Sequence, residues 1–455
     1  MTAKFNCLFR SLLEKELFSL DERADCCRRE TIMTRNVFRA IAVFTTLAIG
    51  SLSCASSLAQ EAQVPSPRDT ASGIIDAEKA KAQSLSPVAP SHGEQEFDQF
   101  EDKIFDPLMK PNGPTFQLGG LPTGGGFSLG PRYIRRDLLH EHLISDSYLV
   151  GSTKKWYMGQ STLDFVGLMD NHLQLTAAGA YQNAASMPYY GEGSNSSKDN
   201  QSNFRREFTS AHFGGRFHFL EQKLSAGYSV GGLLVNVGPG GRNDWPSTDK
   251  IFNEANTPGL EKQSNFITGT ASIIADLTTP SFSNPKGLIL EAKDTQIWDQ
   301  SSNNSSFHLL QTQATYYVPF INGMRTLVLR ARNETTFHAD GQQVPFYLQP
   351  TLGGPNDLRG YERYRYYDNG SSLLSGEYKW SVAGSVEMAL FGDGGNVYSR
   401  PGLIGLRELR GDGGFGVRFK NKQQEIMRFD VGFSPEGVKV WFVFNNAFGR
   451  LYRSF

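Results

Sequence analysis

The sequence predicts an all-β fold, a transmembrane antiparallel β-barrel of about 16 strands. Apolar and polar residues alternate from about Pro114 to the end, which is the period of a strand with two unlike faces. Short turns alternate with long polar connections, as in outer-membrane barrels. The longest connection carries glycines and arginines, and an aspartate follows on a strand. The 47 glycines and 12% aromatic residues suit barrel corners and membrane-interface belts.

A secretory signal peptide is predicted over residues 33–59. Arg35 and Arg39 supply its positive start, residues 41–50 are apolar, and Ser57-Leu58-Ala59 has the small-x-small pattern of a cleavage site. The apolar run is too short to cross a bilayer as a helix, and no later stretch offers about 18 consecutive apolar residues. We therefore expect export through the general secretory route.

Composition divides the rest of the chain into three parts. Residues 1–32 are polar, and we interpret them as an N-terminal extension that results from a wrongly assigned start codon, with Met33 as the true start. Residues 60–113 are rich in Pro, Ser, Ala, Gln and acidic residues, and predict a disordered periplasmic linker. This linker is a candidate contact for a periplasmic partner. Residues 114–455 are the predicted barrel.

Charge and cysteine content exclude several functions. The chain has 45 basic and 46 acidic residues, so it lacks the basic footprint of a nucleic-acid-binding protein. Its four cysteines all precede the predicted linker, at Cys7, Cys26, Cys27 and Cys54. The barrel can therefore contain no disulfide or thiolate site. The eight histidines are scattered and make no ligand set, so we expect neither metal nor cofactor.

The strands are predicted from the period of two. They lie near 114–118, 125–134, 139–149, 157–167, 171–183, 204–219, 222–237, 264–277, 287–299, 305–319, 323–336, 372–381, 384–397, 411–420, 424–433 and 438–448. In the last strand, one face carries Val438, Val440, Phe442, Phe444 and Phe448, and the other carries Lys439, Trp441, Val443, Asn445 and Ala447. The two strands before it place charged residues opposite their aromatic face. A soluble sandwich and a lipid-facing barrel share this period.

The connections favour the barrel. Short turns are expected at Met169-Asp170-Asn171, Glu221-Gln222, Ile321-Asn322-Gly323 and Asn421-Lys422-Gln423. Long polar connections are expected at 184–203, 238–264 and 337–371. An even strand count with short turns on one side and long loops on the other is the outer-membrane pattern, with both termini in the periplasm.

The longest connection contains the strongest motif. Gly353 and Gly354 permit a tight turn. Arg359 precedes Gly360, which has no side chain to block the guanidinium, so Arg359 can bind a carboxylate with two hydrogen bonds. Asp393 follows on a predicted strand. This spacing suggests an arginine folded into the barrel that meets an aspartate there. A tyrosine-rich solvated loop explains the same residues equally well.

The segment Gly353-Gly354 through Leu358-Arg359-Gly360-Tyr361 resembles the arginine-glycine-aromatic loop of the outer-membrane assembly factor superfamily, the bacterial surface antigen family. The strand motif Phe391-Gly392-Asp393-Gly394-Gly395 and the acidic position Glu377 are similar to those of the same family. The likeness covers about 114–448 and is specific in its last hundred residues.

The resemblance implies a sixteen-stranded barrel whose sixth extracellular loop is tucked inside. Arg359, Gly360, Tyr361, Asp393 and Glu377 would then lock the loop to the wall. Phe442, Phe444 and Phe448 would form the C-terminal signal that the barrel-assembly machinery reads, although a seven-residue tail follows Phe448. The first and last strands would pair weakly and form a lateral seam. The linker is too short for the family's periplasmic polypeptide-transport-associated domains, so the chain resembles the subset without them.

The implied function is assembly or transport of protein or lipid clients at the bacterial outer membrane, in contact with its lipid. A passive pore or structural surface barrel without clients is the alternative. A soluble or surface-anchored β-sandwich is a third. No enzyme is predicted: Gly126–Gly130 and Gly227–Gly231 match a nucleophile elbow, but lie in alternating strands rather than at a strand-to-helix turn. The dinucleotide-like Gly411–Gly416 also opens a strand.

Overall fold

The computed structural model describes residues 112–279, 285–302, 304–320, 324–383, 385–401, 409–420 and 425–444. The chain divides into two units, Met1–Ala89 and Pro90–Phe455, and every described residue belongs to the second. The predicted extension, signal peptide and nearly all of the linker lie outside the described residues. So do Phe448 and the turns predicted at residues 321–323 and 421–423.

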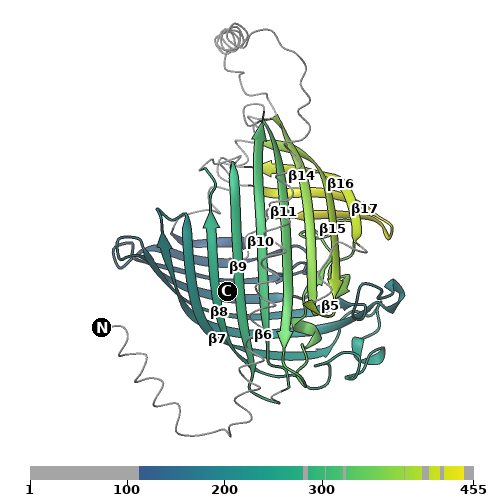
Figure 1. Ribbon diagram of the computed structural model, residues 1–455. Coiled ribbons are helices and arrows are strands. Elements are labelled where there is room, and N and C mark those ends of the chain that lie inside the picture. Colours follow the sequence, from purple (N-terminus) through teal and green to yellow (C-terminus); the bar gives the residue numbers. More distant parts are fainter. Residues whose placement is uncertain are drawn as a thin grey trace, which may run out of the picture. The chain divides into compact units, whose positions relative to one another are not determined.

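The described residues form a sixteen-stranded antiparallel sheet, in which each strand pairs with the sheet's next strand along the chain (Figure 1). A separate two-stranded sheet lies within the connection between its eleventh and twelfth strands. The larger sheet confirms the predicted strand number and order. Its first eight strands are β1 (Gly113–Leu118), β2 (Ser128–Leu138), β3 (Leu143–Ser152), β4 (Tyr157–Leu168), β5 (Leu173–Tyr189), β6 (Ser202–Phe219), β7 (Leu224–Pro239) and β8 (Phe266–Asp276). The next eight are β9 (Gly287–Asp299), β10 (Phe307–Phe320), β11 (Arg325–His338), β14 (Gly370–Ala383), β15 (Val386–Tyr398), β16 (Arg410–Lys420), β17 (Glu425–Ser434) and β18 (Gly437–Val443).

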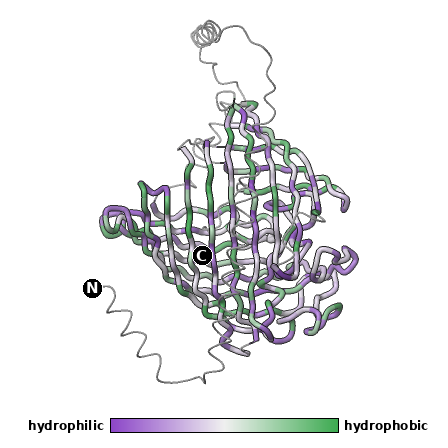
Figure 2. Tube along the Cα trace, viewed as in Figure 1, coloured by the Kyte–Doolittle hydropathy of each residue, from purple (hydrophilic) through white to green (hydrophobic). Residues whose placement is uncertain are grey.

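The two faces of the sheet differ as the alternation predicts. In β18, Val438, Val440 and Phe442 are each more than half exposed, whereas Trp441 on the opposite face is only 4% exposed. Hydrophobic and hydrophilic residues alternate along the strands (Figure 2). A soluble sandwich would bury its apolar face, so the exposed apolar face rules out that alternative.

Strand boundaries were predicted wrongly at two places. β5 runs to Tyr189 rather than ending near residue 183, so the connection after it is shorter than expected. The strands expected at 125–134 and 139–149 are β2 and β3, and the turn between them lies at Leu139-His140-Glu141, about four residues later than expected. These three residues all have positive φ, from 49° to 69°. The prediction failed because none of them is a glycine or asparagine, the usual sequence markers of such a conformation. The first strand also begins at Gly113, inside the predicted linker.

Three long connections leave the sheet at one end, as predicted. They join β5 to β6, β7 to β8 and β11 to β14, and contain the short helices η2 (Lys198–Asn200), η3 (Thr248–Lys250) and η4 (Phe346–Leu348). Buried aromatic residues pack between them: Tyr189 contacts the rings of Phe204, Phe252, Phe346 and Tyr367 at centroid distances of 5.0–6.5 Å. The largest hydrophobic core of the described part therefore lies among the long connections and the strand ends beside them.

The first and last strands form the edges of the sheet. β1 has six residues and β18 has seven, and within the described residues no backbone pairing joins them. The ring of Phe127, which precedes β2, lies 6.1 Å from the ring of Phe444, which follows β18. No helix among the described residues is long and apolar enough to cross a membrane.

Candidate functional site

The connection between β11 and β14, residues 339–369, is called the inner loop here. Within it, β12 (Thr351–Leu352) pairs with β13 (Tyr366–Tyr367) and closes the segment that carries Arg359. Gly353 and Gly354 follow β12 with φ of 116° and 110°, values that side chains disfavour. A Cβ on Gly353 would lie 2.3 Å from the Glu362 carbonyl oxygen, so this turn requires glycine.

Arg359 is buried, at 2% exposure, and contacts two acidic residues of the wall. Its Nε donates to Asp393 Oδ2 at 2.7 Å and its Nη2 donates to Asp393 Oδ1 at 3.0 Å. Its Nη1 donates to Glu377 Oε2. The guanidinium also stacks on Phe391, with 3.6 Å between its carbon and the ring centroid. Only a planar, forked cation satisfies all of these contacts at once.

The ion pairs continue from β14 and β15 into the next two strands. Arg418 on β16 donates to both oxygens of Glu377, at 3.1 and 2.9 Å, and to Asp430 at 2.5 Å. Arg428 on β17 also donates to Asp430. We call Arg359, Glu377, Asp393, Arg418, Arg428 and Asp430 the Arg359 cluster.

The Arg359 cluster balances its own charge, because it contains three cations and three anions. Every member is 5% exposed or less. Buried charges are tolerated when they are paired and hydrogen-bonded, whereas removing one partner leaves an uncompensated charge. The cluster therefore depends on the inner loop being in place.

Wall side chains also hold the backbone of the inner loop. Trp441 Nε1 donates to the Arg359 carbonyl oxygen at 2.6 Å, and Ser434 Oγ donates to the Gly360 carbonyl oxygen at 2.8 Å. Arg428 Nη2 donates to the Pro355 carbonyl oxygen at 2.8 Å. These bonds satisfy loop carbonyls that lie away from water. The loop is thus tied to the last strand as well as to the acidic wall.

The approach of loop to wall is close enough to require glycine on both sides. A Cβ on Gly360 would lie 2.7 Å from the Asp412 Cβ, and one on Gly432 would lie 2.5 Å from the Arg359 carbonyl oxygen. Tyr361 is 2% exposed, and its hydroxyl donates to the Gly411 carbonyl oxygen at 3.3 Å. The tyrosine-rich segment is therefore packed rather than solvated.

Arg365 ties the inner loop to two other connections. Its Nε donates to both oxygens of Glu436, in the β17–β18 turn, at 2.9 and 3.0 Å. Its Nη2 donates to the Ser196 carbonyl oxygen, in the β5–β6 connection, at 2.8 Å. Lys198 adds a bond to the Glu436 carbonyl oxygen at 3.2 Å. One arginine thus holds three segments that are far apart in sequence.

We expect Arg365→Ala to loosen the β5–β6 connection, because it removes a nearly buried donor from two residues, Glu436 and Ser196, at a cost of about 1–3 kcal/mol. Limited trypsin digestion of the folded protein should cleave after Lys198 several times faster than in the parent. Arg242→Ala is the matched control, since Arg242 pairs with Asp244 at an exposed site in its own connection. Equal cleavage rates for the Arg365 variant and the parent would contradict this role.

The structure brings together Arg359, Gly360, Glu377 and Asp393, and places Tyr361 beside them. The sequence prediction missed Arg418, Arg428, Asp430 and Trp441 as parts of this site. The alternation of their strands could have placed all four on the inward face, because their neighbours in sequence are outward aromatic or apolar residues. Of the C-terminal aromatics, Phe442 faces outward and contacts Phe444 at 5.0 Å between ring centroids.

The described residues contain no cluster of side chains suited to a metal ion. The motifs that resemble enzyme signatures lie on strands: Gly227–Gly231 within β7 and Gly411–Gly416 within β16. Ser128, the serine of the other elbow-like motif, begins β2.

The Omp85 superfamily domain matches residues 180–439, which include the inner loop and every member of the Arg359 cluster. The chain belongs to the Omp85 superfamily. No curated protein sequence is significantly similar to it. The family assignment agrees with the resemblance seen in the sequence.

Solved structures share the fold of this Omp85 barrel. BamA from Haemophilus ducreyi, lacking POTRA domains 1–3, is 12% identical with a TM-score of 0.54, covering 73% of this chain and 69% of that one. CdiB from Escherichia coli is 10% identical with a TM-score of 0.50, covering 73% of this chain and 62% of that one. This chain thus spans less than two thirds of CdiB. At these identities the likeness establishes the barrel fold alone.

Proposed function

We propose that this Omp85 barrel lies in the bacterial outer membrane and assists the insertion or translocation of client proteins or lipids there. The observation that carries the proposal is the family match over residues 180–439. The Arg359 cluster supports it, because the inner loop is joined to the wall as the resemblance implies. In this proposal Arg359, Glu377 and Asp393 hold the shape of the wall and catalyse nothing.

The outer face supports a membrane location. Apolar side chains such as Leu149, Tyr228, Ile273 and Leu390 are each more than half exposed there. Outward aromatic residues also pair near the two ends of the strands: Tyr157 with Tyr181 at one end, and Tyr378 with Trp380 at the other. Aromatic side chains are typical of the two membrane interfaces of a barrel.

The sheet edges suggest where clients would enter the membrane. By analogy with the family, β1 and β18 form the seam that opens sideways. Both strands are short, and the described residues show no pairing between them. Short strands give few hydrogen bonds and so a weak junction. Residues 60–113 remain a proposed contact for a periplasmic partner.

A passive pore is the second candidate, and the packing of the long connections argues against it. Tyr189, Phe346 and Tyr367 are nearly fully buried among those connections, which favours a barrel closed at that end. We expect the purified protein to show little steady conductance in planar bilayers. Large, steady openings would favour the pore instead.

The decisive experiment is depletion of the protein in its own host, followed by quantitative proteomics and lipid analysis of the outer-membrane fraction. Loss of a defined set of proteins or of one lipid class, restored by the wild-type chain, would support the proposal and name the clients. A fraction that lacks only this protein would overturn it.

A further inference from the structure

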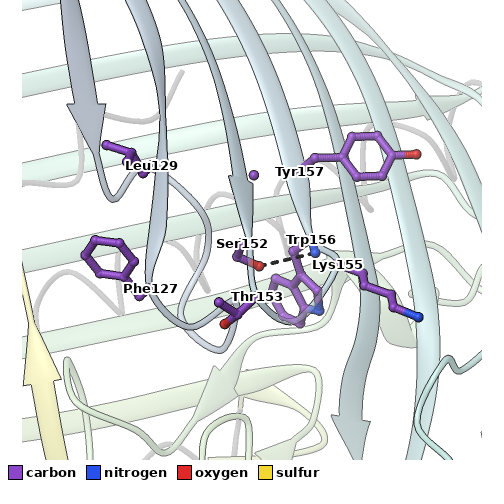
Figure 3. Close-up of a pocket in the computed structure, with 8 residues that line it drawn as sticks. Phe127, Leu129, Ser152, Thr153, Lys155, Trp156 and Tyr157 are labelled. Carbon is purple, nitrogen blue, oxygen red and sulfur yellow. Dashed lines mark hydrogen bonds between the residues drawn. The ribbon is translucent and has the colours of Figure 1, made fainter.

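An apolar groove of about 570 Å³ lies on the outer face, where β2, β3 and β4 meet their connections (Figure 3). It is lined by Phe127, Leu129, Gly151, Ser152, Thr153, Lys155, Trp156 and Tyr157. Phe127, Leu129 and Tyr157 are about half exposed, so apolar surface faces outward around the hollow. Pockets of about 300–1,000 Å³ are the usual size for small ligands.

Gly151 produces the hollow. Its neighbours on the outer face, Leu149 and Tyr157, carry large side chains, whereas a Cβ built on Gly151 would meet no atom within 4 Å. The strand therefore leaves a gap in the apolar wall. An outer wall in a membrane meets acyl chains, so such a gap is a place for one to lie.

The turn that borders the groove is rigid. The Ser152 N–H donates to the Trp156 carbonyl oxygen at 2.9 Å, and the Lys155 N–H donates to the Ser152 carbonyl oxygen at 3.0 Å. Trp156 is 1% exposed and anchors the turn in the aromatic core. Lys155 itself is exposed and lines the groove. A preformed turn that carries a cation suits binding without large reorganisation of the backbone.

Positive charge gathers beside the groove. The Cγ and Cδ of Lys154 lie 3.6 Å from the Cβ position of Gly126, the residue before Phe127. Burial lowers the pKa of the Lys154 ammonium, and the charges of Arg363 and Arg242 lower it further, while Glu362 opposes them. A negative group placed here would relieve this repulsion.

We propose that an anionic membrane lipid occupies this groove, with an acyl chain along Gly151 and its phosphate at Lys154 and Lys155. The inference rests on the proposed membrane location, and adds a lipid site that the assembly function does not require. The lysines of the rim can bind a phosphate, and the apolar slot can bind an acyl chain. The two together therefore favour a lipid with a phosphate headgroup over a free phosphate or an uncharged acyl chain.

The test uses the full-length folded protein in a nonionic detergent, with native mass spectrometry as the readout. Phosphatidylglycerol is the anionic probe, and phosphatidylcholine with the same acyl chains is the zwitterionic control. We expect one tightly retained phosphatidylglycerol per protein.

Gly151→Leu should fill the groove and lower retention about tenfold, which corresponds to about 1.4 kcal/mol. Gly232→Leu is the matched control, because a Cβ there meets only the Phe266 carbonyl oxygen, at 3.9 Å, on the outer face of β7.

A second variant tests the charged rim. Lys154→Gln with Lys155→Gln should weaken phosphatidylglycerol binding by about fivefold for each lysine and leave phosphatidylcholine unchanged. Wild-type retention in Gly151→Leu would overturn the site, and an unchanged preference between the two lipids in the lysine variant would overturn the role of the headgroup. A two-copy complex that Gly151→Leu dissolves would assign the groove to a second copy of the chain. Lipid binding is measured on purified protein, whereas the proposed function is tested by depletion in the host. A failure of the lipid site can therefore be told apart from a failure of the proposed function.

Discussion

Arg359→Ala is expected to destabilise the barrel by about 3–5 kcal/mol, the cost of breaking a buried ion pair from one side. Asp393, which is 5% exposed in the parent, would lose both of its hydrogen bonds from Arg359. Glu377 would keep its two bonds from Arg418. The measurement is the temperature at which the folded barrel loses its compact migration in detergent gels, supported by thermal unfolding followed by circular dichroism.

Two further variants separate charge from shape at this position. Arg359→Lys keeps the charge without the planar fork or the stack on Phe391, and should fall between the parent and the alanine variant. Arg359→Met combined with Asp393→Asn removes a cation and an anion together, and should recover part of the loss. Arg205→Ala is the control, since its pair with Glu207 is partly exposed and worth at most about 1 kcal/mol. If the Arg359→Ala variant is as heat-stable as the parent, Arg359 does not hold the inner loop to the wall.

Gly432→Ala is the second substitution with a large expected effect. The added methyl group would lie 2.5 Å from the Arg359 carbonyl oxygen and 2.8 Å from the Gly360 nitrogen, so the inner loop must move away from β17. Overpacking of this kind costs about 1–3 kcal/mol. The shift would also stretch the bond from Trp441 Nε1 to the same oxygen.

Intrinsic tryptophan fluorescence and heat stability together report on this movement, because Trp441 is 4% exposed in the parent. We expect lower heat stability and an emission shift toward longer wavelength. Gly392→Ala is the matched control on β15, two strands away from β17 in the sheet, where a Cβ meets only the Asp412 carbonyl oxygen, at 3.8 Å. If both glycine variants behave like the parent, the loop does not approach the wall this closely.

Local sequence was sufficient to predict the sheet. A period of two with aromatic residues on one face and charges on the other is a property of each strand by itself, and it located all sixteen strands. It failed by about four residues at Leu139-His140-Glu141, because residues without a turn signature adopt positive φ there. Gly353 and Gly354 likewise marked a true fold-back of the chain.

The candidate site was predicted only in part. The loop motif and its spacing suggested that Arg359 meets Asp393, but a solvated loop explained them equally well, and the resemblance was needed to favour the pair and to add Glu377. Arg359 and Asp393 lie 34 positions apart, and nothing in the alternation of strands requires that they meet. Arg418 and Asp430 could be placed on the inner face from sequence, but their partners could not. Which of several inward charges pair depends on the register between strands, and the register is set by the whole sheet.

By itself, the sequence determined the fold class, the strand order, the unlike faces and the position of the loop motif, because these follow from local periodicity and glycine chemistry. Tertiary structure alone decided three other features. They are the ion pairs within the Arg359 cluster, the hydrogen bond from Trp441 to the loop backbone, and the groove at Gly151. Each of these depends on atoms from separate strands arriving within a few ångströms of one another, and distance in space is not encoded in spacing along the chain.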